Sequence, residues 1–362
     1  MTICLNMIVK DEAPVIARCL GSVLTFVDTW VIVDTGSTDG TQSIIRELAT
    51  AKPGELHERP WVSFGHNRNE ALELARGKAD YLFFIDADET LRLPRSFEFP
   101  ALDGDGYYIS CEYAGTRYGR WALVSGALPW RWEGVVHEYL TCDRPFTLGT
   151  LVGPAIVVAH DGARSRNPLT YLKDAALLED ALRHDPEHAR NVFYLAQSYR
   201  DAGELERSRE LYRRRAEMGG WEEEVWFSLY QAAILDERLG AEAPLVSAAY
   251  LRAFQNRPTR AEPLVALASF HRRRGEHAVA FIYAQQAAAC PPPSDLLFVD
   301  DSVYRWRALD ELAVSAFYAE RLDDGRTAML RLLKEGRFPD AERPRMLQNL
   351  QFYFPDNQPA RR

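Results

Sequence analysis

Residues 81–89 read Tyr-Leu-Phe-Phe-Ile-Asp-Ala-Asp-Glu, a short apolar run that ends in carboxylates. A run of this length and composition is typical of a buried strand. The earlier segment Thr29–Val33 has the same character and ends at Asp34, where the turn Thr35–Gly40 follows. Within this turn, Ser37 and Thr38 are expected to cap the helix that comes next.

Segments with helical spacing separate these strands from each other and from a first strand over Ile3–Val9. The predicted helices cover about 13–23, 41–49 and 67–76. Strands that alternate with helices predict a mostly parallel, Rossmann-like α/β sheet, which binds its ligands at the carboxyl ends of the strands. Both acidic turns fall at such ends, so we expect the functional site there.

The rest of the chain has a different character. Residues 107–156 are rich in aromatic side chains and arginines, which predicts antiparallel strands added to the sheet, either as a half-buried surface or as a pocket. From residue 169 onward the pattern is helical, and Gly203 and Gly275 lie two periods of 36 residues apart, which resembles tetratricopeptide repeats. We therefore predict an α/β domain over 1–165, with halves at about 1–100 and 101–165, and an all-α solenoid over 166–362.

Composition excludes several classes of protein. Lys and Arg number 43 against 52 Asp and Glu, a net charge of −9, which argues against nucleic-acid binding. The five cysteines form no CxxC pair, as is typical of a reducing compartment without disulfides or structural zinc. No window reaches 18 apolar residues, and Lys10-Asp11-Glu12 interrupts the first apolar stretch. We expect no transmembrane segment, no signal peptide and a cytoplasmic protein.

Asp86 and Asp88 flank a small residue at the end of a predicted strand, where two carboxylates can converge on one divalent cation. Magnesium or manganese held in this way can bridge a diphosphate and neutralise it as it leaves. Taken alone, the same triplet is a weak signal and is more typical of two solvated acids in a turn. Its meaning depends on the motifs around it.

Four motifs occur in order along the first domain: Met-Ile-Val-Lys-Asp-Glu over 7–12, Val-Asp-Thr-Gly-Ser-Thr-Asp over 33–39, Asn-Arg-Asn-Glu over 67–70, and the Asp-Ala-Asp triplet. Together they resemble the family 2 glycosyltransferases of the GT-A fold, over roughly residues 2–165. The segment Gly-Val-Val-His-Glu over 134–138 resembles a branch of that family that often carries trailing tetratricopeptide repeats. The resemblance implies a metal-dependent, inverting enzyme that uses a nucleotide-sugar.

The resemblance also implies a role for each matching residue on the donor side. Asp34 resembles the acid that accepts the imide N–H of uracil, which points to a UDP-sugar. Arg68 resembles the arginine near the base and phosphates, and Asn69 is expected to fix the start of that helix. Glu12 resembles the loop glutamate that lines the nucleotide site, and Asp86 is expected near the ribose.

The same resemblance implies a metal set and a base. Asp88 is expected to ligate Mn²⁺ or Mg²⁺ together with Asp86, and either His160 or His137 is expected to complete the set. Glu138 is the candidate general base of an inverting transfer, with His137 beside it in the catalytic segment. Because adjacent residues on a strand point to opposite faces, at most one of this pair faces the site if the segment is extended.

The acceptor side is less specific. Trp130, Arg131 and Trp132 are the candidate acceptor contacts, since aromatic faces stack well on sugar rings. The acceptor is expected to be a saccharide or a peptide or protein, and the repeats are expected to dock it or to form a homodimer. The alternative hypothesis is a non-catalytic repeat protein that binds peptides or proteins and retains a relic GT-A domain.

Overall fold

The computed structural model describes residues 1–354, so the last part of the predicted repeat domain, 355–362, lies outside the described residues. The chain forms two compact units, Met1–Gly203 and Glu204–Arg362. The strands of the first unit are β1 (Ile3–Val9), β2 (Thr29–Asp34), β3 (Gly54–Glu58), β4 (Tyr81–Phe84), β5 (Glu89–Arg92), β6 (Gly106–Tyr113), β7 (Thr116–Ser125), β8 (Arg131–Glu133), β9 (Tyr139–Thr141) and β10 (Leu148–Val158). Its helices are α1 (Ile16–Val23), α2 (Thr41–Leu48), the short turn η1 (Ala49–Ala51), α3 (Phe64–Ala75), α4 (Thr170–His184) and α5 (Ala189–Asp201).

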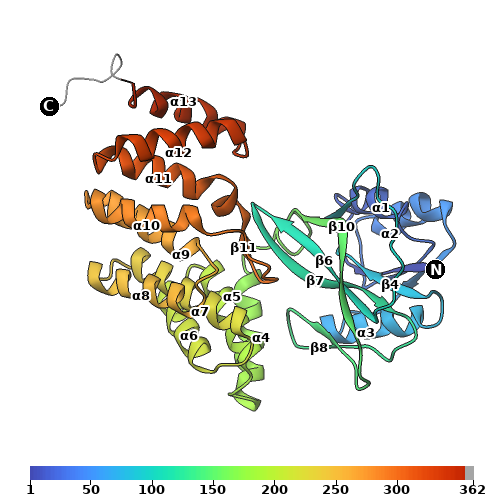
Figure 1. The fold of residues 1–362 in the computed structure, drawn as a ribbon. Helices are drawn as coiled ribbons and strands as arrows, with labels where there is room; N and C mark the ends of the chain where they lie inside the picture. Colours follow the sequence, from blue (N-terminus) through green and yellow to red (C-terminus); the bar gives the residue numbers. More distant parts are fainter. Residues whose placement is uncertain (355–362) are drawn as a thin grey trace. The chain divides into compact units, whose positions relative to one another are not determined.

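The main sheet runs in the order β3-β2-β1-β4-β7-β6-β10-β5. Strands β3, β2, β1 and β4 are parallel neighbours, whereas β7 is antiparallel to both β4 and β6. Strands β8 and β9 form a separate antiparallel pair. The predicted α/β fold is confirmed as a mixed sheet, with the antiparallel strands in the aromatic region (Figure 1).

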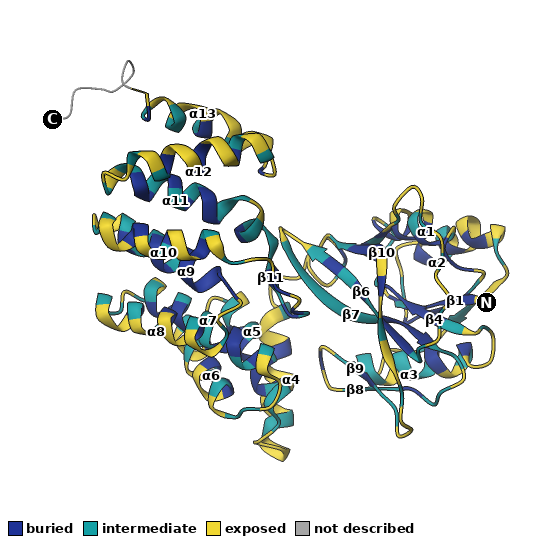
Figure 2. Cartoon of the chain, in the orientation of Figure 1, coloured by how far each residue is buried: buried dark blue, intermediate teal, exposed yellow. Residues whose placement is uncertain are grey.

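The side chains of β1 point alternately to the two faces of the sheet, and both faces are covered. Ile3, Leu5 and Met7 share one core with α1 and α2, whereas Cys4 belongs to a second core that includes Leu72 of α3. Figure 2 shows the buried strands between these helices. Because both faces are covered, the parallel strands expose mainly their ends to ligands.

The register brings those ends together. Val9 pairs with Asp34 at the ends of β1 and β2, and Asp34 pairs with Glu58 at the end of β3. Strand β4 runs parallel to β1 on its other side and ends at Phe84, two residues before Asp86. The acidic turns that follow β2 and β4 therefore leave the sheet at the same edge.

The second unit is a layered stack of helices in which neighbours along the chain pack together (Figure 1). Gly203, the last residue of the first unit, and Gly275 both lie at positive φ, 85° and 77°, shortly before a new helix. This conformation suits glycine, which explains the spacing seen in the sequence. The elements are α6 (Leu205–Glu217), α7 (Glu222–Arg238), α8 (Ala243–Asn256), α9 (Glu262–Arg273), α10 (His277–Ala289), β11 (Val299–Asp300), η2 (Val303–Arg307), α11 (Ala308–Tyr318), α12 (Leu322–Glu335), η3 (Asp340–Glu342) and α13 (Arg343–Gln351).

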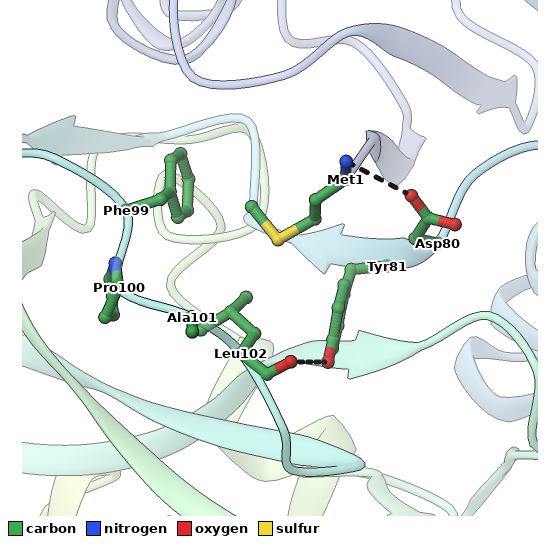
Figure 3. Close-up of a pocket in the computed structure, with 7 residues that line it drawn as sticks. All are labelled: Met1, Asp80, Tyr81, Phe99, Pro100, Ala101 and Leu102. Atoms are coloured by element: carbon green, nitrogen blue, oxygen red, sulfur yellow. Dashed lines mark hydrogen bonds and ion pairs between the residues drawn. The ribbon is translucent and has the colours of Figure 1, made fainter.

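Two further features bear on the predictions. Among residues 1–354, none of the helices combines the length and the apolar composition needed to cross a membrane. A pocket beside the amino ends of β1 and β4 is lined by Met1, Asp80, Tyr81 and the segment Phe99–Leu102 (Figure 3). Because it adjoins the starts of these strands, this pocket lies apart from the carboxyl ends at which the motif residues gather.

Gly54→Ala provides a test of the packing under β2. A Cβ at Gly54 would overlap the indole of Trp30, whose Nε1 is fixed by the carbonyls of Ala49 and Lys52. We expect the substitution to lower the free energy of unfolding by about 1–3 kcal/mol, since the ring cannot move aside freely. Gly21→Ala in α1 is the control, because a Cβ there would meet no atom of the described residues within 4 Å. Equal urea-unfolding midpoints for the two variants would contradict this packing.

Candidate functional site

Two loops at the ends of β1 and β2 hold each other in place. The backbone N–H of Asp11 donates to Ser37 Oγ at 2.8 Å, and the N–H of Thr38 donates to Asp11 Oδ1 at 2.8 Å. Helix α2 has Gly40 at its N-cap, with no side-chain cap. The expectation that Ser37 and Thr38 cap this helix is therefore wrong, because these residues bind the loop after β1 instead.

Asp34 ends β2 and is buried. Its Oδ1 accepts hydrogen bonds from the backbone N–H groups of Gly36 and Ser37, both at 2.9 Å, and from Gln42 Nε2 at 3.1 Å. Its Oδ2 is buried and has no partner within the described structure. A fixed carboxylate with one unused, desolvated oxygen is suited to accept a hydrogen bond from a ligand.

Glu12 and Asp88 approach each other around Gly162. A Cβ at Gly162 would lie 3.0 Å from Asp88 Oδ2 and 3.1 Å from Glu12 Oε2. The N–H of Ala163 donates to Glu12 at 3.1 Å. Burial, reinforced by the charge of Asp88, raises the pKa of Glu12 to about 7, and burial and Asp86 raise the pKa of Asp88. Two carboxylates with raised pKa values form an environment that favours an added positive charge.

Arg18 of α1 fixes the segment on which His160 and Gly162 lie. Its guanidinium makes two hydrogen bonds to Asp161, at 2.8 and 2.7 Å, and one to the carbonyl of Asp88 at 3.0 Å. The N–H of Gly162, two residues after His160, donates to Asp88 Oδ2 at 3.3 Å, so the segment that carries the imidazole closes over the predicted carboxylate. The His160 ring packs edge-on against Tyr113.

Asp86 is held by two arginines. Arg68 of α3 donates to Oδ1 at 2.7 Å, and Arg120 of β7 lies 3.6 Å from Oδ2. These two cations lower the pKa of Asp86 to about 2. Arg120 also makes a bidentate contact with the buried Glu89, whose Oε2 accepts the N–H of Asp86. Asp86 is thus an ionised carboxylate whose two oxygens both face arginines.

Glu138 lies on the other side of Arg68. Its Oε2 is 3.5 Å from Arg68 Nε, and its Oε1 is buried and has no hydrogen-bond partner among the described residues. Burial raises the pKa of Glu138, and Arg68 partly offsets this effect. The Arg68 guanidinium stands over the Trp132 ring, 5.1 Å from its centroid, and the Trp132 Nε1 is likewise buried without a partner in the described part of the chain. Arg68 therefore connects the segment after β4 to the candidate base.

The remaining candidates lie in different surroundings. Asn69 binds the backbone of Trp132 through both amide atoms, at 2.9 and 2.8 Å, while Asn67 holds the segment before α3. Trp130 is a core residue whose Nε1 donates to the Ser125 carbonyl, and Arg131 pairs with acidic neighbours. Of the three predicted acceptor contacts, Trp132 is the one beside Arg68.

His137 is brought to a different environment from His160. Its ring stacks on Tyr194 of α5 with centroids 4.1 Å apart. His137 is exposed to solvent, and the Arg190 guanidinium donates to its backbone carbonyl at 3.1 Å. A cation held beside this residue disfavours a metal ion there, so the geometry favours His160 over His137 as a metal ligand. Within residues 1–354, no three His, Cys, Asp or Glu side chains already converge as a metal site.

Several site residues were not found by sequence reasoning. Arg18, Glu89, Arg120 and Arg164 all act on the motif residues, but none stands at a motif position. Glu89 directly follows the Asp-Ala-Asp triplet, and Arg120 stands next to Trp121 in a strand whose later residues are apolar. These two signals could have indicated a buried ion pair.

Comparison with known proteins gives one family match and several similar proteins. Residues 4–93 match the family described as Glycosyl transferase family 2. A TPR repeat-containing protein of Synechococcus elongatus is 28% identical over 317 residues, which cover 80% of this chain and 75% of that protein. The SPbeta prophage-derived glycosyltransferase SunS of Bacillus subtilis is 27% identical over 210 residues, 53% of this chain, which spans about half (48%) of SunS. Among solved structures, MamA gives a TM-score of 0.38 at 14% identity, over 46% of this chain and 89% of that chain.

Glu12 provides a test of the site's electrostatics. Its raised pKa, about 7 against an ordinary 4.5, means that its contribution to stability is complete below pH 4.5 and is lost as the pH rises through 7. Glu12→Gln cannot titrate there. We therefore expect the melting temperature of the variant, relative to the unaltered protein, to be higher at pH 8 than at pH 5. Scanning calorimetry at both values checks this, and an identical difference at both would show that Glu12 is not buried beside Asp88.

Proposed function

We propose that the chain transfers a sugar from a UDP-sugar to an acceptor, because residues 4–93 match the glycosyl transferase family 2. The acceptor class we propose is a saccharide or a peptide or protein that offers a hydroxyl or thiol nucleophile. The reaction we propose is metal-dependent and inverts the anomeric carbon. The observation that carries this proposal is the cluster of buried, unpartnered polar atoms beside the ends of β2 and β4.

The nucleotide is proposed to bind at Asp34. Its Oδ1 is used by three donors of its own turn, which leaves Oδ2 as a buried acceptor. The imide N–H of uracil is a donor of the matching kind, whereas cytosine offers a ring acceptor at the same position. Leaving such an oxygen unpaired costs free energy, so a pyrimidine with a donor is selected. Glu12 lies on the adjacent loop after β1, which binds the same turn through Asp11 and Ser37.

The diphosphate is proposed to lie between the arginines and Asp88. Asp88 and His160 offer a carboxylate and an imidazole on one side, and donor phosphate and water would complete the shell of a manganese or magnesium ion. Such an ion supplies positive charge to the leaving diphosphate. Asp86 has both oxygens facing Arg68 and Arg120, so its role in the proposal is to hold these cations near the ribose and phosphates.

Glu138 is proposed as the general base. Its unpartnered Oε1 would accept the proton of the acceptor hydroxyl or thiol as that atom attacks the anomeric carbon. The bond between this carbon and the diphosphate oxygen breaks at the same time, and UDP leaves with the electron pair. The raised pKa of Glu138 makes it a better proton acceptor than an exposed carboxylate. The acceptor attacks the anomeric carbon from the face opposite the leaving UDP. Because no second carboxylate acts as a nucleophile first, this single displacement inverts the configuration of that carbon.

The repeats are proposed to dock the acceptor or to join two copies of the chain. The alternative, a peptide- or protein-binding repeat protein with a relic donor domain, predicts no selective UDP binding by the first unit. Donor binding is therefore the experiment that separates the two functions.

Asp34→Asn tests the nucleotide site. The variant keeps an oxygen for the turn but can place an amide N–H where the second oxygen stands, against the uracil N–H. We expect the free energy of UDP binding to weaken by about 1–3 kcal/mol, measured by calorimetry without metal. Asp88→Asn is the matched variant. It should keep the UDP affinity measured without metal and lose the increase in UDP affinity that Mn²⁺ gives the unaltered protein. Unchanged UDP affinity in Asp34→Asn would remove Asp34 from the site.

Glu138→Gln tests the base. The amide keeps the shape of the side chain but cannot take a proton, so we expect transfer to slow by about 10²–10⁴-fold while UDP affinity stays the same. A screen of nucleotide-sugars with Mn²⁺ and Mg²⁺ identifies the donor, and NMR of the product reports its anomeric configuration. A retained configuration, or full activity of the variant, would contradict this role.

A further inference from the structure

The segment that carries Glu138 has an unusual backbone. His137 has φ at 52°, in the left-handed region that residues other than glycine rarely adopt. Such a conformation costs about 1–3 kcal/mol and persists only where the surroundings hold it. The contacts that hold His137 therefore also decide where the next residue, Glu138, points.

Those contacts come from α5. Arg190 donates to the carbonyl of His137 at 3.1 Å, and the Tyr194 ring stacks on the His137 imidazole with the planes only 12° apart. The Arg190 guanidinium also lies 4.8 Å from the centroid of Tyr139 and 4.8 Å from that of Tyr194. Helix α5 thus holds the residues on both sides of Glu138.

The Glu138 carboxylate has little else to orient it. Its Oε2 approaches Arg68 Nε at 3.5 Å, and its Oε1 has no hydrogen-bond partner among residues 1–354. The orientation of the Glu138 side chain is then set largely by its backbone. A displacement of about 1 Å at a reacting group can cost a hundredfold in rate.

We propose that Arg190 and Tyr194 are positioning residues that act on Glu138 through the backbone and ring of His137, so that helix α5 belongs to the catalytic unit. This inference rests on the proposed role of Glu138 as base. Helix α5 follows the sheet domain in the chain and resembles the repeats in sequence, yet it lies in the same compact unit as the sheet. The helical region would then contribute to the chemistry as well as to docking.

A double-mutant cycle in the full chain tests the inference. The variants are Arg190→Ala, Glu138→Gln and the pair, with turnover of the donor found in the screen as the readout and UDP affinity as a second measurement. We expect Arg190→Ala to lower turnover at least tenfold and to leave UDP affinity within twofold. In the Glu138→Gln background the same change should lower turnover less than twofold, because the group it positions is already absent. The proposal would be overturned if Arg190→Ala lowered turnover by the same factor in the unaltered and the Glu138→Gln backgrounds. Full turnover in Arg190→Ala alone would overturn it as well.

Variants at Tyr194 provide an independent route if Arg190→Ala does not fold. Tyr194→Phe keeps the stacked ring and should keep turnover, whereas Tyr194→Ala should lose it at least tenfold. Arg183→Ala, an exposed arginine of α4 that pairs with Asp180, is the control that should change nothing. The NMR resonance of the His137 imidazole should shift in Tyr194→Ala and stay in place in Arg183→Ala. An unmoved resonance in Tyr194→Ala would overturn the contact.

The failure of the proposed function is distinguishable from the failure of this inference. If the unaltered chain binds UDP but turns over no donor, the proposed function fails, whereas the NMR result still reports on the contact between Tyr194 and His137.

Discussion

The site depends on one buried cation. Arg68 leaves α3 and meets Asp86 from the segment after β4 on one side and Glu138 from the segment before β9 on the other. A desolvated guanidinium between two carboxylates is held in place, because removing either partner leaves an uncompensated charge. Burial alone would disfavour the charge of Arg68, and the two acids reverse that effect and raise its pKa. The proposed donor side and the proposed acceptor side therefore share a single electrostatic centre.

Much of the donor side could be predicted from the sequence, because parallel strands end at a common edge. Asp34 and Asp86 follow apolar runs, and Glu12 follows the first strand, so their proximity requires only the strand order. The pairing of Glu89 with Arg120 could not be predicted in the same way. It depends on β7 running antiparallel to β4, and the register of two distant strands is set by packing across the whole sheet.

The acceptor side was harder to predict for a related reason. Trp130 and Trp132 belong to one aromatic motif, yet the first lies in the core and the second lies under Arg68. Likewise, His137 and His160 both occupy motif positions, but the segment of His160 binds Asp88 through Gly162, whereas Arg190 and Tyr194 of helix α5 hold His137. Motif position shows which residues are candidates, and long-range contacts decide which of them share a site.

The contact between Glu12 and Ala163 spans 151 residues of chain. When the protein is made on the ribosome, β1 and its loop emerge long before the segment that must close over them. The parallel strands can pair early, but Glu12 and Asp88 face each other without the Gly162 segment until β10 has formed and returned to the edge of the sheet. Contacts of such long range form slowly, since closing the intervening chain costs entropy. The site is therefore among the last parts of its domain to be assembled during synthesis.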